Sequence, residues 1–477
     1  MTASPRWTDR LFEHTDARAL AVLRILLGGL LFYEMSYYHS IRLVDMGLVG
    51  PKLLFPYEGF TWVRPLGKAA MDAILATMAF STLAIAAGLL YRMATMLFFA
   101  GFTYVLLLDR CIYNNHFYLF ALLAFLFTLI PAHRAWSLDR LLFKARMTST
   151  TVPRWCWWAL RLQVVIVYFY GGIAKLNPDW LAHMQPMRTA LEAAARGGAL
   201  EGLLTSMPVV AFFTYGGLLF DLAVGPLLWW KRSRRYILPF VLLFNLTNHL
   251  LFDDIGVFPF FMIAATILFF DPEEVAAFMD RRGRRSGGAP SAPGSSAARG
   301  TVLALFAGYF AFQLLFPLRW LLLPGDVDWT SIGQRFSWRM KVSTRDPLRI
   351  AYFVHDEQGN KRPVALERFI NNMQANVSAY DPRVTVRFAR WMKEEMARRG
   401  FPNVRITSEI IIRHNGRPPR YLFPPDQDLA AIQPDLRHPE RWVPPLEPGL
   451  EHRVPASELE RIRREAAIPV RRQVRRR

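Results

Sequence analysis

The sequence lacks several features on which many enzymes depend. Only two of its 477 residues are cysteines, Cys111 and Cys156. The topology argued below places them on opposite sides of a membrane, so structural disulfides do not hold this protein together. The chain has no His-Glu-x-x-His zinc motif, no Walker phosphate loop and no Gly-x-Ser-x-Gly elbow. We therefore expect no metal site, and neither nucleotide hydrolysis nor serine-hydrolase chemistry is indicated.

The sequence is also poor in acidic residues. It has 38 Asp and Glu against 58 Lys and Arg, a formal net charge of +20. Nucleic-acid binding is one interpretation of this excess, and the terminal "VRRQVRRR" encourages it. Most of the basic residues, however, lie in short loops between apolar segments. We therefore expect the tail to contact lipid headgroups or water, and we expect no nucleic-acid partner.

Apolar residues, in contrast, are abundant. The chain is 52% hydrophobic and 14% aromatic, with a mean hydropathy of +0.15, which is too apolar for an ordinary soluble enzyme of this length. A membrane-spanning helix needs about 20 mostly apolar residues. The candidate spans are roughly 18–40, 70–90, 93–108, 117–131, 155–173, 209–230, 236–252, 256–270 and 301–323. The fold class predicted is a mainly α, polytopic membrane protein with about nine transmembrane helices.

The positions of the basic residues indicate an orientation. Lys and Arg near spans accumulate on the cytoplasmic side of a membrane. With a cytoplasmic N-terminus, the inner segments contain the basic clusters at 134–154, 231–235 and 281–299. The outer loops are poorer, although the first one, with Arg42, Lys52, Arg64 and Lys68, fits less well. We therefore expect an integral membrane protein with its N-terminus in the cytoplasm and its C-terminal part outside, in the plasma membrane if the source is bacterial.

The composition changes along the chain and divides it into domains. We predict a helical transmembrane domain at 1–323, with a flexible, Gly/Ser/Pro/Ala-rich cytoplasmic loop at 283–300. Alternating apolar and polar residues then predict a small extracytoplasmic α+β domain at 324–430. A Pro-rich basic extension at 431–477 follows.

Turn and helix signals predict the elements of the α+β domain and the extension. They are a hairpin around Gln358-Gly359-Asn360, a helix over about 369–399 that stops at Gly400, a second hairpin around Asn415-Gly416, and a short helix near Ser457–Ala467.

Three groups of polar residues lie where predicted spans meet the outer side. They are Asn114, Asn115 and His116 at the start of span four, Lys175 at the end of span five, and Asn248, His249, Asp253 and Asp254 at the end of span seven. Each group has an ordinary explanation: a lysine reaches toward the interface, a histidine beside an asparagine caps a helix, and aspartates occupy solvated turns. Within span one, Glu34 and Arg24 are costly charges that could also reach an interface. The coincidence of the three groups on one side favours a functional site.

Lys175 is the most informative of these residues. It stands in "YFYGGIAKLNPDWL", between an apolar segment and a Pro-Asp-Trp turn. Partial burial among apolar groups would favour a neutral amine, which can act as a base near neutral pH. The preceding Gly171 and Gly172 would let another helix or a flat ligand approach closely.

Several motifs resemble one known family. They are "LLDRCIYNNHFYLFALLAFLFTLIPAHRAWSLDRLL", "RLQVVIVYFYGGIAKLNPDWL", "GGLLFDLAVGPLLWW", "NLTNHLLFDDIGVFPF", "IGQRFSWRMKV" and "HNGRPPRYLFPPDQDLA". In this order, from about residue 15 to about 430, they resemble the vitamin K-dependent γ-glutamyl carboxylase family, in the bacterial form that has a horizontally transferred transmembrane domain.

The resemblance implies an activity and roles for particular residues. Members of the family convert glutamate side chains to γ-carboxyglutamate with reduced vitamin K, O₂ and CO₂, and they release the quinone epoxide. By resemblance, Lys175 deprotonates the hydroquinone and His116 assists carboxylation. The residues expected near the quinone are Asn114, Asn115, Trp180, Asn248 and His249. The implied partners are membrane lipids and a glutamate-containing protein or peptide.

Departures from the animal members of the family keep other functions open. Cys111 has no partner cysteine on the outer side, one of two adjacent lysines is replaced by Ala174, and no large C-terminal extension follows. These differences put propeptide-guided substrate recognition in doubt. The alternative is a non-catalytic membrane scaffold that binds quinone or lipid and uses its outer domain for protein contacts. A transporter is a third possibility, but the chain lacks the visible repeats that organise many transporters.

Overall fold

The computed structural model describes residues 7–144, 149–252, 255–281, 296–447, 449 and 452–467. The chain forms two compact units. The first, here called the helical unit, comprises Met1–Gly50, Pro56–Leu318 and Phe336–Met340. The second, the sheet unit, comprises Pro51–Phe55, Arg319–Arg335 and Lys341–Arg477. Two short segments are therefore exchanged between the units along the sequence.

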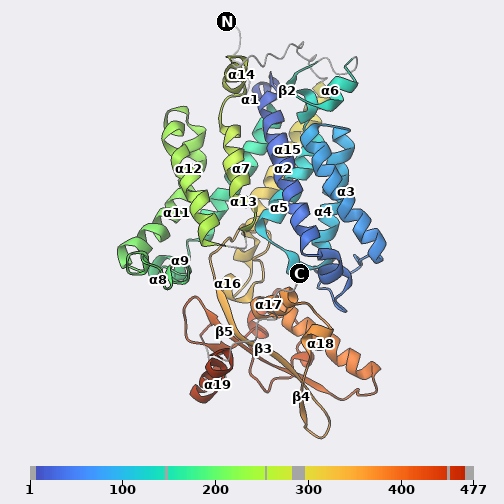
Figure 1. Cartoon of the computed structure of the whole chain (residues 1–477), viewed down its shortest axis with the longest axis vertical. Helices are drawn as coiled ribbons and strands as arrows, with labels where there is room; N and C mark the ends of the chain where they lie inside the picture. Colours follow the sequence, from blue (N-terminus) through green and yellow to red (C-terminus); the bar gives the residue numbers. More distant parts are fainter. Residues whose placement is uncertain are drawn as a thin grey trace. The chain divides into compact units, whose positions relative to one another are not determined.

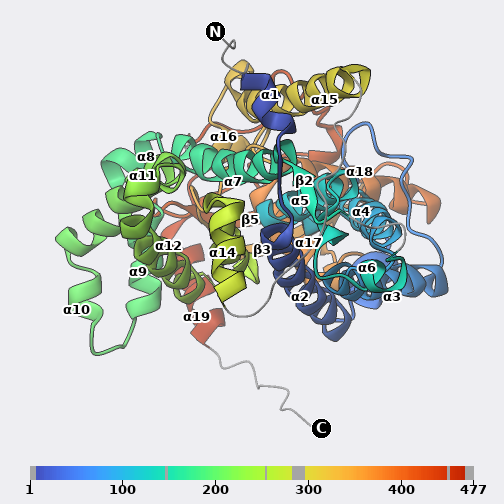
Figure 2. The ribbon, with the colours of Figure 1, turned by 90° about the horizontal axis from the view of Figure 1, so that it is seen from above.

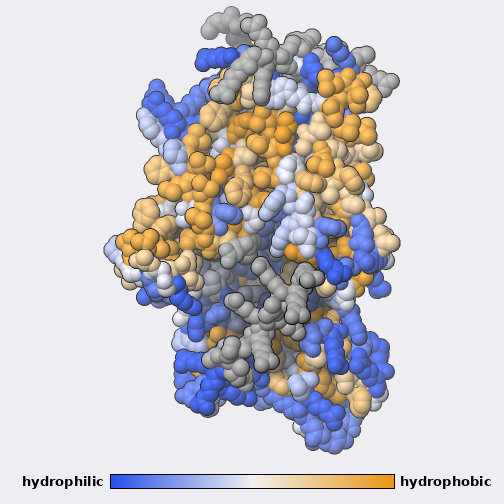
Figure 3. Space-filling model, viewed as in Figure 1, coloured by the Kyte–Doolittle hydropathy of each residue, from blue (hydrophilic) through white to orange (hydrophobic). Residues whose placement is uncertain are grey.

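Six helical segments are long and apolar enough to cross a membrane. They are α2 (Arg18–Ser40), α3 (Lys68–Ala87), α4 (Tyr91–Leu108), α7 (Arg154–Ala174), α11 (Met207–Trp229), and α15 (Ser296–Leu315) with its continuation η6 (Phe316–Leu322). They confirm six of the predicted spans. Apolar side chains gather over the helical unit, as expected for a surface in contact with lipid (Figure 3). The protein is therefore an integral membrane protein.

The other three predicted spans are helical but do not meet the same criterion, so nine spans are not confirmed. They are α5 (Asn115–Leu129), α12 (Lys231–Leu251), and α13 (Phe258–Ala264) with η5 (Ala265–Phe269). α5 and the segment Phe258–Phe269 are apolar but shorter. α12 is long enough, but its first turns, "KRSRR", are strongly basic.

Short elements occupy both ends of the helical unit. One end contains α1 (Trp7–Phe12), β1 (His14–Asp16), β2 (Thr151–Pro153), α6 (Leu138–Leu142) and α14 (Pro272–Arg281), and the other contains α8 (Pro178–His183) and α9 (Met187–Ala195) (Figure 1). The remaining short elements are η1 (Leu43–Val49), η2 (Arg110–Ile112), η3 (Ala132–Arg134) and α10 (Glu201–Leu204). Of the predicted flexible loop, residues 282–295 lie outside the described residues, whereas residues 296–300 begin α15.

Basic residues at the first end pair with acidic ones of α14. Lys231 Nζ lies 3.1 Å from Glu274 Oε1, and Arg18 Nη1 lies 2.6 Å from Asp280 Oδ1. Ion pairs therefore tie the starts of α12 and α2 to α14. This is the end at which the positive-inside pattern places the cytoplasm.

The long helices form two groups on either side of α7. Helices α2 to α5 pack in sequence on one side, and α11 and α12 pack on the other (Figure 2). α7 approaches α11 closely because Gly172 has no side chain: a Cβ there would lie 2.6 Å from Leu222 Cδ2 and 3.1 Å from the Leu222 nitrogen. The expectation that these glycines allow close approach is confirmed for α11.

The sheet unit is built on a four-stranded antiparallel sheet. Its strands are β3 (Arg345–His355), β4 (Lys361–Pro363), β5 (Arg405–His414) and β6 (Arg420–Tyr421), in the order β4-β3-β5-β6. β3 pairs with β5 from Arg345↔His414 to His355↔Arg405, with an irregularity between Pro347 and Arg349. Both predicted hairpins are confirmed. The short elements of this unit are α16 (Val327–Thr330), η7 (Leu366–Arg368), η8 (Leu429–Ala431) and η9 (Pro439–Arg441).

Helices cover both faces of this sheet. On one face, α17 (Asn372–Tyr380) and α18 (Pro382–Arg398) pack against β3 and β5, with the rings of Tyr352 and Phe388 4.8 Å apart. On the other face, Ile462 of α19 (Ala456–Ala467) packs against Ile411 and Tyr421. The predicted helix near 457–467 is confirmed, and its Ile462 belongs to a hydrophobic core cluster of this unit.

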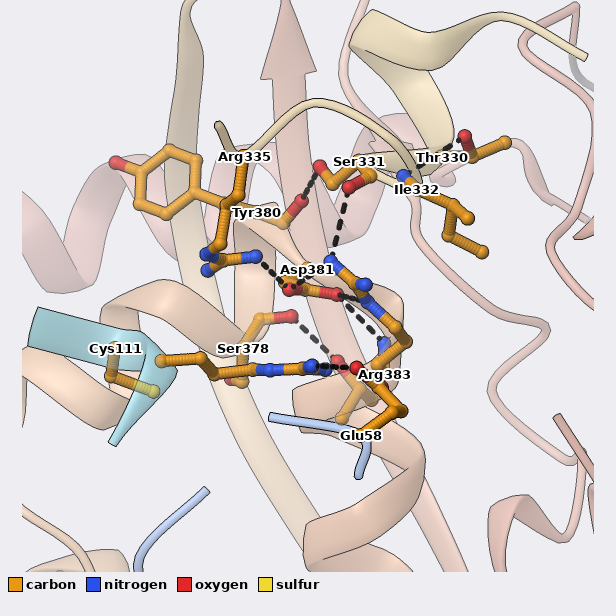
Figure 4. Close-up of polar contacts among 12 residues, drawn as sticks. Glu58, Cys111, Thr330, Ser331, Ile332, Arg335, Ser378, Tyr380, Asp381 and Arg383 are labelled. Carbon is orange, nitrogen blue, oxygen red and sulfur yellow. Dashed lines mark hydrogen bonds and ion pairs between the residues drawn. The ribbon is translucent and has the colours of Figure 1, made fainter. Parts of the chain in front are cut away.

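The region predicted as a helix over 369–399 is helical and ends before Gly400, but it is divided at Asp381 into α17 and α18. Pro382 lacks an N–H, so it disfavours continuation of α17 but suits the first position of a new helix. The Asp381 side chain caps α18 by accepting from the Arg383 nitrogen at 3.1 Å. It also pairs with the guanidinium groups of Arg335 and Arg383 (Figure 4). This buried carboxylate therefore joins the start of α18 to the segment that contains Arg335.

Candidate functional site

Lys175 stands where α7 ends. It is the residue after Ala174, and Asn177 begins α8 by accepting from the Trp180 nitrogen at 2.9 Å. Pro178 at the first position of α8 favours this new start. The sequence "AKLNPDW" thus ends one helix and begins another within three residues. This tight corner keeps the lysine side chain inside the helical unit, where the residue is only 7% exposed.

A buried carboxylate faces the Lys175 amine. Lys175 Nζ donates a short hydrogen bond to Asp221 Oδ2 on α11 and a second one, of 3.2 Å, to the Gly171 carbonyl. Asp221 is 5% exposed. The Lys175 amine therefore has a charged partner in addition to its apolar surroundings. The sequence contained a signal for Asp221, since it is a lone carboxylate in the apolar run "GGLLFDLAVGPLLWW", and charge inside a span is costly.

Trp180 belongs to the same cluster as Lys175. The Lys175 amine lies 5.2 Å from the Trp180 ring centroid, within the range of a cation–π contact. The indole nitrogen of Trp180 donates to the Thr214 carbonyl at 3.0 Å, which fixes the ring against α11. The structure thus brings together two of the residues named from the sequence and adds Asp221 to them.

His116 forms a second cluster with Glu34 and Gly256. His116 is the second residue of α5 and is buried, and Glu34, from α2, is buried too. A Cβ on Gly256 would lie 3.4 Å from Glu34 Oε2 and 3.9 Å from His116 Nε2. The carboxylate and the imidazole therefore converge on the same glycine, which has a left-handed backbone (φ +48°). Glu34 also hydrogen-bonds to Tyr38, one turn further along α2.

One short segment contacts the helices that position both clusters. The Phe336 nitrogen donates to the Tyr113 hydroxyl at 2.8 Å, and that hydroxyl lies 3.0 Å from Asn115 Oδ1, just before His116. At the other end of the segment, Met340 packs near Gly171. A Cβ on Gly171 would lie 3.4 Å from Met340 Cε and 3.2 Å from Asp221 Oδ2. Residues 336–340 thus pack against the start of α5 and the end of α7.

The remaining predicted residues are placed less centrally. Asn114 caps the start of α5 by position, but its side chain makes no cap bond to the helix. His249 is exposed at the end of α12, with its ring 4.9 Å from Phe260, and Asn248 is half-buried beside it. The buried amide of this helix is Asn245, which donates to the Tyr168 hydroxyl at 3.3 Å. Asp253 and Asp254 lie outside the described residues.

The second charged residue predicted inside span one has a structural role. Arg24 is fully buried and donates from Nη2 to the Trp136 carbonyl at 2.6 Å. A Cβ on Gly88 would overlap its guanidinium, so Gly88 makes room for it. The two cysteines, Cys111 and Cys156, are both buried, and no disulfide joins them.

The site thus combines two buried acid–base groupings, each made from different helices. Lys175 and Asp221 are hydrogen-bonded to each other, and His116 and Glu34 adjoin Gly256. Ionisable residues inside a membrane domain are costly, and they mark functional sites or proton relays. Fold and site together define a polytopic membrane protein with an internal acid–base centre and a separate α+β unit.

Comparison with known families agrees with this class of protein and identifies the family within it. Residues 12–273 match the HTTM domain, and residues 298–448 match the family described as vitamin K-dependent gamma-carboxylase, lumenal domain. The chain belongs to the gamma-carboxylase family, whose defining architecture is this pair of domains. No solved structure matches the chain. The family domains indicate a vitamin K-dependent carboxylase-like function and an extracytoplasmic position for the sheet unit.

Proposed function

We propose that this protein is a membrane enzyme that couples oxygenation of reduced vitamin K to the addition of CO₂ to glutamate side chains. The observation that carries the proposal is the buried Lys175–Asp221 pair at the end of α7, in a chain of this family. Reduced vitamin K supplies the oxygen-dependent chemistry that removes the weakly acidic γ-proton of glutamate. The protein has to bind, orient and deprotonate its co-substrates and keep water away.

The residues of the site fit a phenolic co-substrate with an apolar tail. Lys175 offers a nitrogen that can take the proton of a phenolic hydroxyl, and the flat ring of Trp180 lies beside it. Asn115, on α5, offers an amide for hydrogen bonding, and the tail would lie among the apolar helices. We assign Lys175 as the base and Asn114, Asn115, Trp180, Asn248 and His249 as quinone-binding residues.

His116 is assigned to the carboxylation half of the reaction. It is buried among the aromatic rings of Phe117, Phe120 and Phe258, whose centroids lie 4.3, 5.9 and 6.2 Å from its own. A carbanion is reprotonated wherever water reaches it, so a water-poor position suits this step. CO₂ is apolar and can enter such surroundings without loss of hydration.

A turnover assay tests the proposal directly. Purified protein in lipid is given reduced vitamin K, O₂, labelled bicarbonate and a Glu-rich peptide. We expect label in the peptide and formation of quinone epoxide. The absence of both products would contradict an enzyme and would favour the non-catalytic scaffold that binds quinone or lipid. Uptake of a solute by sealed vesicles would instead favour a transporter.

A further inference from the structure

The Lys175 amine is held by a partner from a different helix. Asp221 lies on α11, 46 residues further along the chain, and its Oδ2 accepts a short hydrogen bond from Nζ. Both side chains are almost completely buried, at 9% and 6% exposure. Because the Gly171 carbonyl also accepts from Nζ, two of the three ammonium hydrogens have defined acceptors. The amine is thus fixed in direction as well as in place.

The close approach of α7 and α11 is what makes this pair possible. Gly171 and Gly172 lie one helical turn before the lysine, and Asp221 and Leu222 pack onto them. A Cβ on Gly171 would lie 3.2 Å from Asp221 Oδ2, and a Cβ on Gly172 would lie 2.6 Å from Leu222 Cδ2. Among the described titratable groups, Lys175 and Tyr168 interact electrostatically with Asp221. The carboxylate is therefore a direct partner of the lysine.

A protonated lysine cannot act as a base, and a buried pair offers a solution. An ammonium beside a carboxylate and an amine beside a carboxylic acid contain the same number of protons, so the proton can cross the hydrogen bond without exchange with solvent. The carboxylate that stabilises the ammonium can therefore also take its proton, which leaves the lone pair of the nitrogen available to accept a proton from the substrate.

We propose that Asp221 is the positioning residue and proton acceptor of Lys175, so that the two side chains act as a dyad. The Nζ–H bond breaks, its proton passes to Asp221 Oδ2, and the electron pair stays on nitrogen. Nζ then takes the proton of a phenolic hydroxyl, whose electron pair stays on oxygen. The step consumes one phenol proton and needs no oxidant or reductant. The identity of the phenol rests on the proposed function. The existence of the dyad does not, because it is argued from the contact between Lys175 and Asp221.

The first experiment compares Asp221→Asn with the wild type in the epoxidation assay over a pH range. Asparagine keeps the size and an acceptor oxygen but cannot take the proton. We expect kcat at neutral pH to fall by about 10²-fold or more, as for loss of a group in proton transfer, with little change in KM. Activity should recover as pH rises, because without the carboxylate the amine is a weaker base, and at high pH the phenol loses its proton to solvent instead. A pH-independent loss, or wild-type activity, would overturn the dyad.

A second measurement does not depend on turnover. Lysines are acetylated with a membrane-permeant reagent that attacks only free amines, and Lys175 modification is followed by mass spectrometry. We expect Lys175 to react about tenfold faster in Asp221→Asn than in the wild type, because the ammonium has lost its buried counter-charge. Equal rates would refute the dyad, even in a protein that turns nothing over. If the rates differ but the wild type forms no epoxide, the proposed function fails and the dyad stands.

The matched control is Asp45→Asn. Asp45 Oδ1 lies 2.7 Å from Lys68 Nζ, but this pair is on the surface, with 54% of the lysine side chain exposed. Water replaces a surface partner at little cost. Both Lys68 acetylation and epoxidation should therefore be close to wild type in this variant. A comparable acceleration at Lys68 would show that loss of any carboxylate has this effect, and would count against a special role for Asp221.

Discussion

At the scale of single residues, the lysine of the dyad allows the sharpest test of the assigned base. Lys175→Ala removes the nitrogen and should reduce epoxidation by about 10²-fold or more. The fold should survive, because the orphaned Asp221 carboxyl can take up a proton instead of remaining charged. Lys175→Arg should do no better, since a guanidinium does not lose its proton near neutral pH. Chromatography of the epoxide and thermal unfolding of the purified protein measure the two properties.

Full epoxidation by Lys175→Ala would show that another group is the base. Loss of epoxidation in Lys175→Ala together with a large drop in unfolding temperature would instead point to a structural lysine. The double variant Lys175→Ala with Asp221→Asn separates these outcomes. It leaves no charge at the position of the Lys175–Asp221 pair, so it should fold as well as the wild type and remain inactive.

His116 allows a test of how the two halves of the reaction are divided. His116→Ala should reduce carboxylation by about 10²-fold and affect epoxidation much less, because the imidazole lies beside Glu34 at Gly256, whereas the assigned base is Lys175. The two products are measured in the same reaction, as label in the peptide and as epoxide. His39→Ala, at an exposed position of α2 to which no role is assigned, provides a comparison for loss of a histidine from the membrane domain. Equal losses of both products in His116→Ala would argue against separate roles.

At the scale of elements, the contact between α7 and α11 should determine whether the dyad forms. Gly172→Ala would place a Cβ 3.1 Å from the backbone nitrogen of Leu222, which cannot move without moving α11. Overpacking of this kind costs about 1–3 kcal/mol, and it would also separate Lys175 from Asp221. We expect a lower unfolding temperature and weaker epoxidation together.

Gly216→Ala is the control for that change. Gly216 lies on α11 as well, but a Cβ there would meet no atom within 4 Å. Because alanine also favours helices over glycine, this variant should be as stable as the wild type or slightly more so. If Gly172→Ala behaved in the same way, the close approach of α7 and α11 would not be what holds the dyad together.

The sequence predicted the positions of the helices well, but it predicted poorly which residues of different helices contact one another. Runs of apolar residues located all nine helical segments, and Gln358-Gly359-Asn360 and Asn415-Gly416 located both hairpins, because these signals are local. Asp221 was missed because its meaning depends on a helix 46 residues away. The break at Asp381-Pro382 was missed although its signal is local, since the helical pattern on both sides outweighed it.

Local sequence signals also identified single residues of the candidate site but not the contacts between them. Lys175, His116 and Trp180 could be named from their motifs, and Glu34 could be named as a charge inside a span. That His116 and Glu34 meet at Gly256 depends on the packing of α2, α5 and the residues before α13, which no pattern in the sequence encodes. The exposed position of His249 could not be foreseen either, because a residue at a helix end can face either way.

At the scale of the whole molecule, the number of membrane crossings decides where the sheet unit lies. The six long apolar helices alone are an even number of crossings and would leave Arg10 and Gln358 on the same side. Nine crossings would place them on opposite sides. α5 has 15 residues, roughly 22 Å at 1.5 Å per residue, against a hydrocarbon core of about 30 Å. α5 carries Asn115 and His116 at its start, so its shortness would set these residues below the membrane surface.

Cysteine accessibility distinguishes these arrangements. The native Cys111 and Cys156 are both buried, so the variants Arg10→Cys, Arg232→Cys and Gln358→Cys, at exposed positions, can be labelled over a low background. With an impermeant maleimide on intact cells, we expect labelling at 358 only, and labelling at 10 and 232 after permeabilisation. Six crossings predict instead that 10 and 358 behave alike and that 232 behaves in the opposite way. With a cytoplasmic N-terminus, that pattern would place the sheet unit in the cytoplasm as well. The unit could then not reach a secreted glutamate-containing substrate, which would contradict the proposed function.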